Sequence, residues 1–561
     1  MRKRAGYIFL WVLPFVFITS CSKSGSNGPA IDPAPSALSN TNIKVDNTTA
    51  ITNAVNYNVK PTAAIKLSFN NALDRSSVAA AVTVTENGLA TVPANYSYEN
   101  NDSTLVITSP ALKFLTKYSL TASTALQSIK KGKLNTDISL QFVTQIDSTD
   151  KFPVIADNAL LDTIEKRTFK YFWDYAHPVS GLARERSNAT PETITSGGSG
   201  FGIMAIPVAI SRNFITRAEG LARMQKIVGF LKNTAQKFHG AFPHWLNGTT
   251  GVVIPFSAKD DGADLVETSY LMAGLLTARQ YFNNAAADET ALRSDINSLW
   301  NAVEWSWFRK SNENVLYWHW SPTNNFDMNV KIQGWNECLI TYILAASSTG
   351  FGIPQIVYKE GFARSGAMVN NTIYFGYQLP LGPDRGGPLF FEHYSFLGID
   401  PTGLNDLYAN YQTQTTNHTK INYEYCKANP NGFFGYSNLC WGLTASDAPT
   451  GYNASSPTND IGVIAPTAAI SSIAYTPTES MNALKFFYYK LGDKLFKEYG
   501  FIDAFSLKDL WFANSFLAID QGPELIMLEN YRTKMVWNLL TSCPEIKNGM
   551  KNVLGFTAPY L

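Results

Sequence analysis

The pattern of apolar and polar positions changes its period partway along the chain. Across residues 42–147, short runs such as "AIKLSFN", "STLVITS" and "SLQFVTQ" alternate apolar and polar side chains, and Asn, Asp, Gly or Pro separates them. Alternation with a period of two, interrupted by turn residues, predicts a small β-sandwich. We expect this region to be a spacer, because it contains no cluster of aromatic residues that would suit a sugar platform.

From residue 155 to residue 561 the period becomes helical. Apolar residues recur at three-and-four spacing in "ALLDTIEKRTFKYFWDYA", "RAEGLARMQKIVGFLKNTAQKF", "LVETSYLMAGLLTARQYF", "TALRSDINSLWNAVEWSWF", "NECLITYILAAS", "SMNALKFFYYKLGDKLFKEYG" and "PELIMLENYRTKMVWNLL". Long segments such as "ARERSNATPETITSGGSGFG" separate these runs and are expected to be functional loops. Many helices joined by elaborate loops favour an all-α (α/α)6 barrel, and no fixed repeat period suggests a solenoid. The predicted fold is therefore multidomain, with an all-β sandwich followed by the barrel.

The first 21 residues have the features of an export signal. "MRKRAGYIFLWVLPFVFITSC" has a basic start, an apolar run too short for a comfortable membrane span, and small residues before Cys21. Its end resembles a bacterial lipobox, in which Cys21 would carry the lipid; the alternative is an ordinary signal peptide with a chance cysteine. Residues 22–41 are rich in Ser, Gly, Pro and Ala, as a flexible tether should be. We expect an outer-membrane lipoprotein that faces the periplasm or the cell surface and meets the membrane only through its anchor.

Composition narrows the classes of partner. The net charge of the 561 residues is +1, which lacks the strong basic field of nucleic-acid binding proteins. The 12 Trp, 27 Tyr and 34 Phe suit stacking on sugar rings, or equally a large aromatic core. The cysteines after the signal form no CxxC, and the histidines form no pair at helical spacing, so we expect no metal and no other cofactor. Whether Cys426 and Cys440 form a disulfide is left open.

Carboxylates gather at the start of one predicted helix. In "KDDGADLVETSY", Asp260, Asp261, Asp264 and Glu267 precede an apolar run, and the last two share one helix face. Helix capping and the helix dipole account for carboxylates in a first turn. They do not account for Glu267, which points into a mostly apolar segment. Asp260, Asp264 and Glu267 are therefore candidate catalytic residues.

The second candidate is Glu337 in "KIQGWNECLITYILAAS". A lone Glu between a Trp-Asn pair and an almost uncharged helix is partly desolvated, which raises a carboxyl pKa and suits a general acid; the alternative is a first-turn Glu that pairs with the dipole. Hydrolysis of a glycosidic bond needs an acid and a second carboxylate, about 6.5–9.5 Å apart in inverting enzymes. We therefore expect Glu337 on one side of a cleft and the Asp264/Glu267 group on the other. Stretches such as "FPHWLNG", with His244 and Trp245, would supply stacking and hydrogen bonds to sugar.

Six ordered motifs carry a family resemblance. "GLARERS", "GADLVETSYLMAGLL", "GWNECLITYILA", "HYSFLGIDP", "WGLTASDAPTGY" and "IDQGPELIMLENYRTKMVW" resemble those of the glucoamylase-like hydrolases of Bacteroidetes, glycoside hydrolase family 144, and residues 42–147 resemble bacterial Ig-like domains. The resemblance implies inverting hydrolysis of β-1,2-glucan, either endo or releasing sophorose, with the candidate carboxylates at the cleavage subsites. It also implies that the sugar cleft is lined by Arg184, Tyr394, Trp441, Asp447, Glu529 and Tyr531.

Two rival functions remain open. A non-catalytic glycan-binding lipoprotein of an uptake system would bind oligosaccharide without turnover and would not need Glu337. A polysaccharide lyase of the same fold would need a basic cleft, and the near-neutral loops argue against one. We expect a monomer that acts on glucan.

Overall fold

The computed structural model describes residues 35–561, which form two compact units. One unit ends at Lys113 and resumes over Lys117–Thr144, and the other consists of Phe114–Thr116 and Gln145–Leu561. The predicted export signal and the lipid attachment at Cys21 lie outside the described residues, as does most of the predicted tether.

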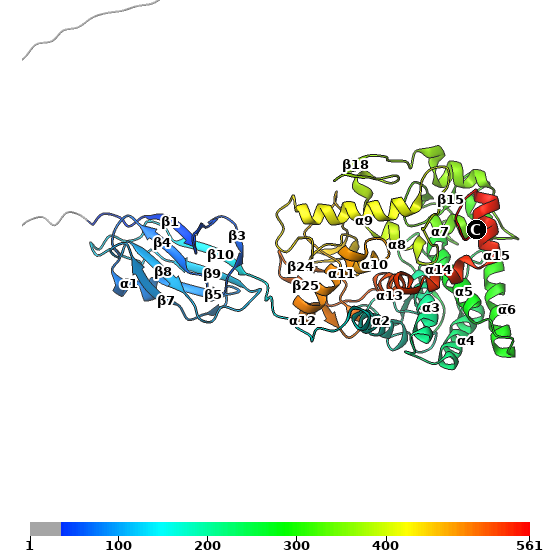
Figure 1. The fold of residues 1–561 in the computed structure, drawn as a ribbon, viewed down its shortest axis with the longest axis horizontal. Coiled ribbons are helices and arrows are strands. Elements are labelled where there is room, and N and C mark those ends of the chain that lie inside the picture. Colours follow the sequence, from blue (N-terminus) through cyan, green and yellow to red (C-terminus); the bar gives the residue numbers. More distant parts are fainter. Residues whose placement is uncertain (1–34) are drawn as a thin grey trace, which may run out of the picture. The chain divides into compact units, whose positions relative to one another are not determined.

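The first unit is a β-sandwich, as the period-two pattern predicts (Figure 1). One five-stranded sheet has the order β2-β1-β4-β8-β7 and the other β3-β10-β9-β5-β6. In β4 the side chains of Ile65, Leu67 and Phe69 are buried while those between them are less so, which is the inward and outward alternation of a strand with one face on a core. The strands are β1 (Asn40–Val45), β2 (Thr48–Thr49), β3 (Val55–Val59), β4 (Ile65–Phe69), β5 (Val82–Glu86), β6 (Ala90–Thr91), β7 (Asn95–Glu99), β8 (Thr104–Thr108), β9 (Lys117–Ala122) and β10 (Ile138–Thr144), and one helix, α1 (Arg75–Ala81), precedes β5.

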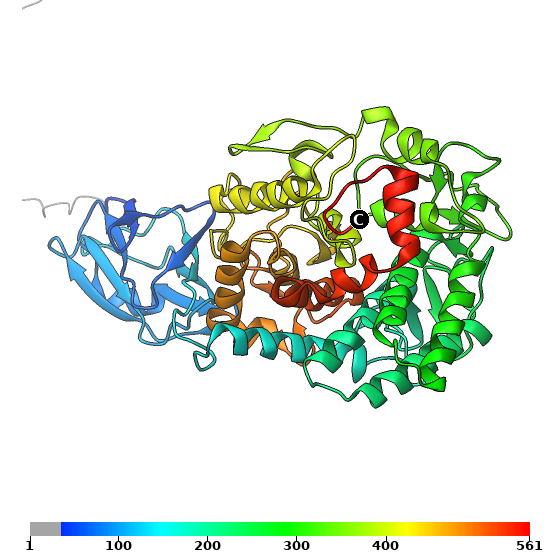
Figure 2. The same ribbon diagram turned by 45° about the vertical axis from the view of Figure 1, so that its right-hand side comes forward.

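Helices dominate the second unit, and Figure 2 shows them following one another around a ring. The bounds of these helices are α2 (Asp157–Trp173), α3 (Ser196–Ser211), α4 (Arg217–Asn233), α5 (Leu265–Tyr281), α6 (Ala287–Ala302), α7 (Leu339–Ser347), α8 (Phe390–His393), α9 (Tyr411–Ala428), α10 (Pro466–Ser471), α11 (Pro477–Lys485), α12 (Gly492–Leu495), α13 (Ala518–Thr533), α14 (Met535–Thr541) and α15 (Pro544–Asn548). Short strand pairs lie in the connections, among them β11 (Thr193–Thr195) with β12 (Trp245–Asn247) and β20 (Ala445–Ala448) with β21 (Gly451–Ala454).

Helix α3 corrects the prediction that its first residues belong to a loop. Its segment "SGGSGFGIMAIPVAIS" is buried along nearly its whole length and packs against α5. A Cβ at Gly200 would lie 2.2 Å from the carbonyl oxygen of Tyr270, and one at Gly274 would lie 2.2 Å from the carbonyl oxygen of Gly200. The glycines that weaken the intrinsic helix propensity therefore allow two backbones to meet, and tertiary packing overrides the propensity.

Two predicted helices are broken in the structure. "PELIMLENYRTKMVWNLL" divides into α13 and α14 at Lys534, whose φ of 59° is left-handed. "SMNALKFFYYKLGDKLFKEYG" ends α11 at Lys485, continues as a π-helical turn and forms only the short α12 afterwards. Hydrophobic periodicity continues across such breaks because both pieces face the same core.

Three helices that position the site start at the same end of the unit. The backbone N–H of Gly197 in α3 donates to the carboxylate of Glu267 in the first turn of α5. At the same end, a Cβ on Gly198 would lie 2.5 Å from the Cβ of Ala518, the first residue of α13. Helices α3, α5 and α13 therefore begin side by side, and the connections before them meet there.

Two further features bear on the predictions. Cys338, Cys426, Cys440 and Cys543 are buried free thiols, so Cys426 and Cys440 are not bonded to each other. Within residues 35–561 no helix combines the length and the apolar character that crossing a bilayer requires.

Candidate active site

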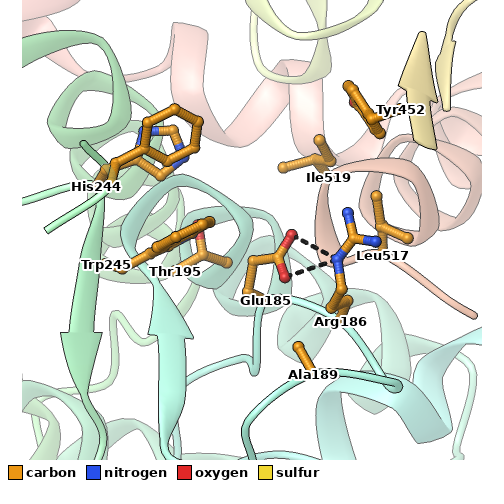
Figure 3. Close-up of a pocket in the computed structure, with 10 residues that line it drawn as sticks. Glu185, Arg186, Ala189, Thr195, His244, Trp245, Tyr452, Leu517 and Ile519 are labelled. Atoms are coloured by element: carbon orange, nitrogen blue, oxygen red, sulfur yellow. Dashed lines mark hydrogen bonds and ion pairs between the residues drawn. The ribbon is translucent and has the colours of Figure 1, made fainter. Parts of the chain in front are cut away.

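A cavity of about 460 Å³ opens where α3 and α13 begin. Figure 3 shows His244 and Trp245 on one side and Tyr452, Leu517 and Ile519 on the other. The full set that lines it is Glu185, Arg186, Ala189, Thr195, His244, Trp245, Phe256, Tyr452, Leu517 and Ile519. A mainly apolar and aromatic cavity with a few convergent polar groups is typical of a small-molecule or sugar site.

Asp264 is the N-cap of α5 and is completely buried. One carboxylate oxygen accepts from the backbone N–H groups of Val266 and Glu267, and the other lies 3.1 Å from Nδ1 of His244 and 3.3 Å from Nε1 of Trp318. Burial alone would raise the pKa of Asp264, but the hydrogen bond from His244 and the nearby His319 lower it. Asp264 is therefore an ionised anchor that orients His244, which suits a supporting group better than a proton donor.

Glu267 lies one turn further along α5, behind the cavity wall. Its Oε2 accepts from the N–H of Gly197 at 2.8 Å and from Oγ1 of Thr195 at 3.4 Å, and its Oε1 lies 4.0 Å from Nε2 of His244. A Cβ at Gly197 would lie 2.5 Å from Oε2, so only glycine permits this approach. Burial raises the pKa of Glu267, while His244 and the Gly197 N–H act in the opposite direction.

His244 connects this group to the cavity. Burial opposes a charge on its imidazole, but Glu267, Asp264 and Asp260 raise the pKa of His244 to about 9. The ring is thus a cation at neutral pH, and it lies against the tilted ring of Phe256, with 4.4 Å between the centroids. Burial and the charge of Asp264 raise the pKa of Asp260 to about 7, so this third carboxyl group holds a proton below neutrality.

Glu337 is the remaining predicted carboxylate and precedes α7. The residue is half-buried, and desolvation of its carboxyl group together with the charges of Glu267 and Asp264 raises its pKa to about 7. Its own backbone N–H donates to the carboxyl group, and within residues 35–561 no Lys, Arg or His pairs with it. The structure thus gives Glu337 the desolvated environment that the sequence predicts for a general acid.

A second acidic group, of which only Asp447 is among the sequence-based candidates, faces the cavity from the other wall. Arg186 pairs with Glu185 at 3.0 Å and with Asp447 at 2.9 Å. The N–H of Asp447 donates to Asp503, which shares a hydrogen bond with Asp520. Two buried carboxyl groups in contact cannot both ionise: burial raises the pKa of Asp503 to about 7 and raises the pKa of Asp520 well above its ordinary value.

The sequence does contain signals for this second group. Glu185 and Arg186 lie in "GLARERS", where opposite charges alternate in otherwise near-neutral loops, and Asp520 is an acidic residue in the first turn of an apolar helix. Asp503 has no such signal, because only the fold brings it beside Asp520.

Only some of the residues predicted to line the cleft lie at the cavity. His244 and Trp245 line the cavity, and Asp447 reaches it through Arg186. Tyr394 lies between the two acidic groups, because Asp520 and Glu337 both contribute to the raised pKa of its hydroxyl, after burial. Arg184 instead donates to the carbonyl oxygens of Pro191 and Tyr175.

The structure places the other three predicted residues away from the cavity lining. Trp441 is fully buried and its indole N–H donates to the carbonyl oxygen of Glu479, so the ring belongs to the core. Glu529 accepts from Arg212, the C-cap of α3, and Tyr531 follows it near the end of α13. Gly197 is the second residue of α3 and Arg212 is its C-cap, so this end lies about 22 Å from Gly197. The motif that contains Glu529 and Tyr531 does touch the site, but through Ile519 and Asp520.

One set of side chains has the geometry of a metal site. One ligand atom from each of His244, Asp260 and Asp264 lies within 4.8 Å of the others, and the described residues contain no second set of this kind. The protonated His244 offers no lone pair to a cation at neutral pH and donates to Asp264 instead. The arrangement favours hydrogen bonding, and the absence of a metal stays a prediction.

Comparisons with known proteins find a family match for each of the two units. Residues 329–544 match a family model described as "Putative glucoamylase", and residues 39–144 match one described as a bacterial Ig-like domain. An endo-β-1,2-glucanase from Chitinophaga pinensis, solved with sophorotriose and glucose, is 49% identical with a TM-score of 0.71, over 73% of this chain and 100% of that one. A β-1,2-glucanase structure from Parabacteroides distasonis is 36% identical with a TM-score of 0.70, over 94% of this chain and 74% of that one.

A curated relative adds a second mode of action. It is an exo β-1,2-glucooligosaccharide sophorohydrolase of Parabacteroides distasonis, 44% identical over 431 residues. The match takes in 73% of this chain and 60% of the relative, so the chain spans less than two thirds of that protein. With these identities over whole solved chains, the protein belongs to the glucoamylase-like family of glycoside hydrolases, with an N-terminal Ig-like domain.

Proposed function

We propose that this protein is an exported hydrolase of β-1,2-glucan, anchored through Cys21, with the Ig-like unit as a spacer and the helical unit folded as an (α/α)6 barrel. The proposal rests on one observation. Glu337 and Glu267 are desolvated carboxyl groups, the charge of Glu267 helps to raise the pKa of Glu337, and Glu267 contacts His244 and Thr195, which line the aromatic cavity. The 49% identity to an endo-β-1,2-glucanase along that whole chain supports the choice of glucan.

Glu337 is the general acid in this proposal. A pKa of about 7 keeps its carboxyl group protonated in mildly acidic to neutral solution. No cation pairs with it within residues 35–561, so nothing forces it to ionise before it donates to the leaving glycosidic oxygen.

Glu267 is the general base. The Gly197 N–H and the cationic His244 favour its ionised form, while burial keeps it basic enough to take a proton from water. Water then adds to the anomeric carbon as its proton passes to Glu267 and the proton of Glu337 passes to the leaving oxygen. Inversion at a β-linkage gives a product whose new reducing end is α.

Two measurements test the proposal. The protein that lacks residues 1–21 is incubated with linear β-1,2-glucan, and the products are separated by chromatography. A ladder of oligosaccharides means endo action and sophorose alone means exo action. No cleavage of this glucan, with cleavage of another, contradicts the substrate; binding without cleavage of any glucan indicates a glycan-binding protein.

The stereochemistry is measured separately. Proton NMR of fresh product, recorded before mutarotation, shows the α-anomer first if the mechanism inverts. Early appearance of the β-anomer contradicts inversion and assigns Glu267 or its neighbours a nucleophilic role instead.

A further inference from the structure

A buried carboxylate lies beneath the turn that carries Glu337. Glu392, in the short helix α8, has no exposed side-chain surface. Its Oε1 accepts from the indole N–H of Trp335 at 2.9 Å and from the amide of Gln414 at 2.8 Å, and lies 2.8 Å from Nδ1 of His418. One oxygen therefore gathers three donors, and the other, Oε2, has no partner.

Trp335 belongs to the same turn as Glu337, two residues before it. Its ring is 5% exposed and lies 5.6 Å from the ring of Tyr411 and 6.3 Å from that of Phe396. Aromatic packing fixes the plane of such a ring loosely, whereas a hydrogen bond to its one polar atom fixes its direction. The bond to Glu392 thus determines where the backbone of this turn can lie.

The chain that carries Glu392 holds the turn at a second point. Oγ of Ser395 donates to the carbonyl oxygen of Glu337 at 2.5 Å and accepts from the N–H of Ile340 at 3.0 Å. The turn around Glu337 is therefore restrained twice. Glu392 binds the side chain of Trp335, and Ser395 binds the backbone of Glu337.

His418 faces two acceptors. Its Nδ1 lies 2.8 Å from Oε1 of Glu392, and its Nε2 lies 3.0 Å from the carbonyl oxygen of Gly387. A Cβ at Gly386 would lie 2.1 Å from the ring, so glycine is needed for this approach. Two side chains of α9, Gln414 and His418, therefore hold the Glu392 oxygen that accepts from Trp335.

We propose that Glu392 is a positioning residue for Glu337: through Trp335, with Ser395 on the other side, it holds the acid-bearing turn in its half-buried, reactive place. The inference rests on the proposed function, in which Glu337 is the general acid. Loss of the Trp335–Glu392 bond would let the turn move and admit water to Glu337.

This movement has a signature in the pH profile. Burial is the main cause of the raised pKa of Glu337, so water entry lowers that pKa towards its ordinary value. The acid must be protonated, so the alkaline limb of kcat/KM then moves to lower pH. The titratable groups that face Glu337 are Asp264, Glu267, Cys338, Tyr270 and Tyr394, and those around Glu392 are His418, Tyr475 and, beyond His418, His393. None of them is removed in the variants below.

The test compares Trp335→Phe with Trp305→Phe. Both substitutions trim a buried indole to a phenyl ring, but the N–H of Trp305 has no hydrogen-bond partner to lose. We expect Trp335→Phe to lower kcat by about tenfold to a hundredfold, with KM nearly unchanged and the alkaline limb at lower pH. Trp305→Phe should lower the melting temperature by a similar amount and leave both kcat and the limb in place. Ser395→Ala, which removes the hydrogen bond to the carbonyl oxygen of Glu337, should also lower kcat and move the alkaline limb to lower pH.

Three outcomes overturn the inference. They are an unmoved alkaline limb in Trp335→Phe and Ser395→Ala, a limb that moves equally in Trp305→Phe, and a fall in stability without a fall in kcat. If Trp335→Phe does not fold, Ser395→Ala decides alone. If the wild-type protein cleaves no β-1,2-glucan, the proposed function fails, and carbon NMR titration of the Glu337 carboxyl group judges the inference without substrate. Equal titration midpoints in wild type and Ser395→Ala then contradict it.

Discussion

The two ends of α3 both bury acidic side chains, yet they differ in what surrounds them. At the first end Glu267 receives hydrogen bonds from Gly197 and Thr195 and lies beside a cavity. At the last end Glu529 accepts from Arg212 at 2.6 Å. Arg532 pairs there with the buried Glu165 at 2.7 Å. Burial of charge therefore does not by itself mark a site; a desolvated carboxylate without an arginine, next to open space, does.

The pKa values of single residues would not have separated the two ends. Burial raises the pKa of Glu165 to about 8, as high a value as burial gives the carboxyl groups near the cavity. Packing and the ion partners distinguish them, because Glu165 is enclosed with two arginines that a substrate could not displace.

The largest effect is expected at the first end. Glu337→Gln keeps the size of the side chain and removes its proton, so kcat should fall by about 10³-fold while the protein stays folded. Initial rates on linear β-1,2-glucan, with circular dichroism as the folding control, measure this. A loss smaller than tenfold would show that the proton comes from another group.

At the last end the expected effect is on stability. Arg212→Leu leaves Glu529 buried without its cation, which should lower the free energy of unfolding by about 3 kcal/mol. Urea unfolding measures it, and kcat at a temperature where the variant is folded should be unchanged. Lys427→Met, which breaks the exposed pair with Glu424, is the control and should change the free energy of unfolding far less than Arg212→Leu does.

The comparison also predicts a pH dependence of stability. The pKa of Glu337 is raised in the folded state, so the unfolded chain loses this proton at lower pH than the folded one. The contribution of Glu337 to the free energy of unfolding is therefore present in full below the pKa of this group in the unfolded chain. It is lost as pH rises through about 7. Glu337→Gln should be about as stable as wild type at pH 4 and progressively more stable towards pH 7. A difference that shrinks over this range would contradict the burial of Glu337.

The smallest effect is expected at Phe256, an aromatic residue in the cavity lining. Phe256 is 51% exposed, packs with its ring tilted against His244 and lines the cavity, so Phe256→Ala should raise KM about fivefold with little change in kcat. Trp307 is 44% exposed but stacks on His239, outside the cavity lining. Trp307→Ala should leave KM unchanged, and equal effects of the two substitutions would remove Phe256 from the binding surface.

The local part of the fold could be predicted from the sequence. Strand alternation and helical periodicity depend on neighbours a few residues away, so the sandwich and the start of α5 at Asp264 follow from the pattern. The same holds for Glu337, whose apolar neighbours are adjacent in sequence.

Contacts between distant segments could not be predicted. Arg212 and Glu529 are 317 residues apart, so no local pattern indicates that Arg212 neutralises Glu529. Asp503 and Asp520 meet only when the fold brings them together. The helical character of "SGGSGFG" was hidden for the same reason, because its glycines are explained only by the backbone of α5.

The most direct test of the account compares three proteins on linear β-1,2-glucan: the wild type, Glu337→Gln and Glu529→Gln. The products are followed by chromatography at a temperature where all three are folded. We predict that wild type and Glu529→Gln release oligosaccharides and that Glu337→Gln releases essentially none. Activity that survives in Glu337→Gln and disappears in Glu529→Gln would contradict the account, because it would place the chemistry at the other end of α3.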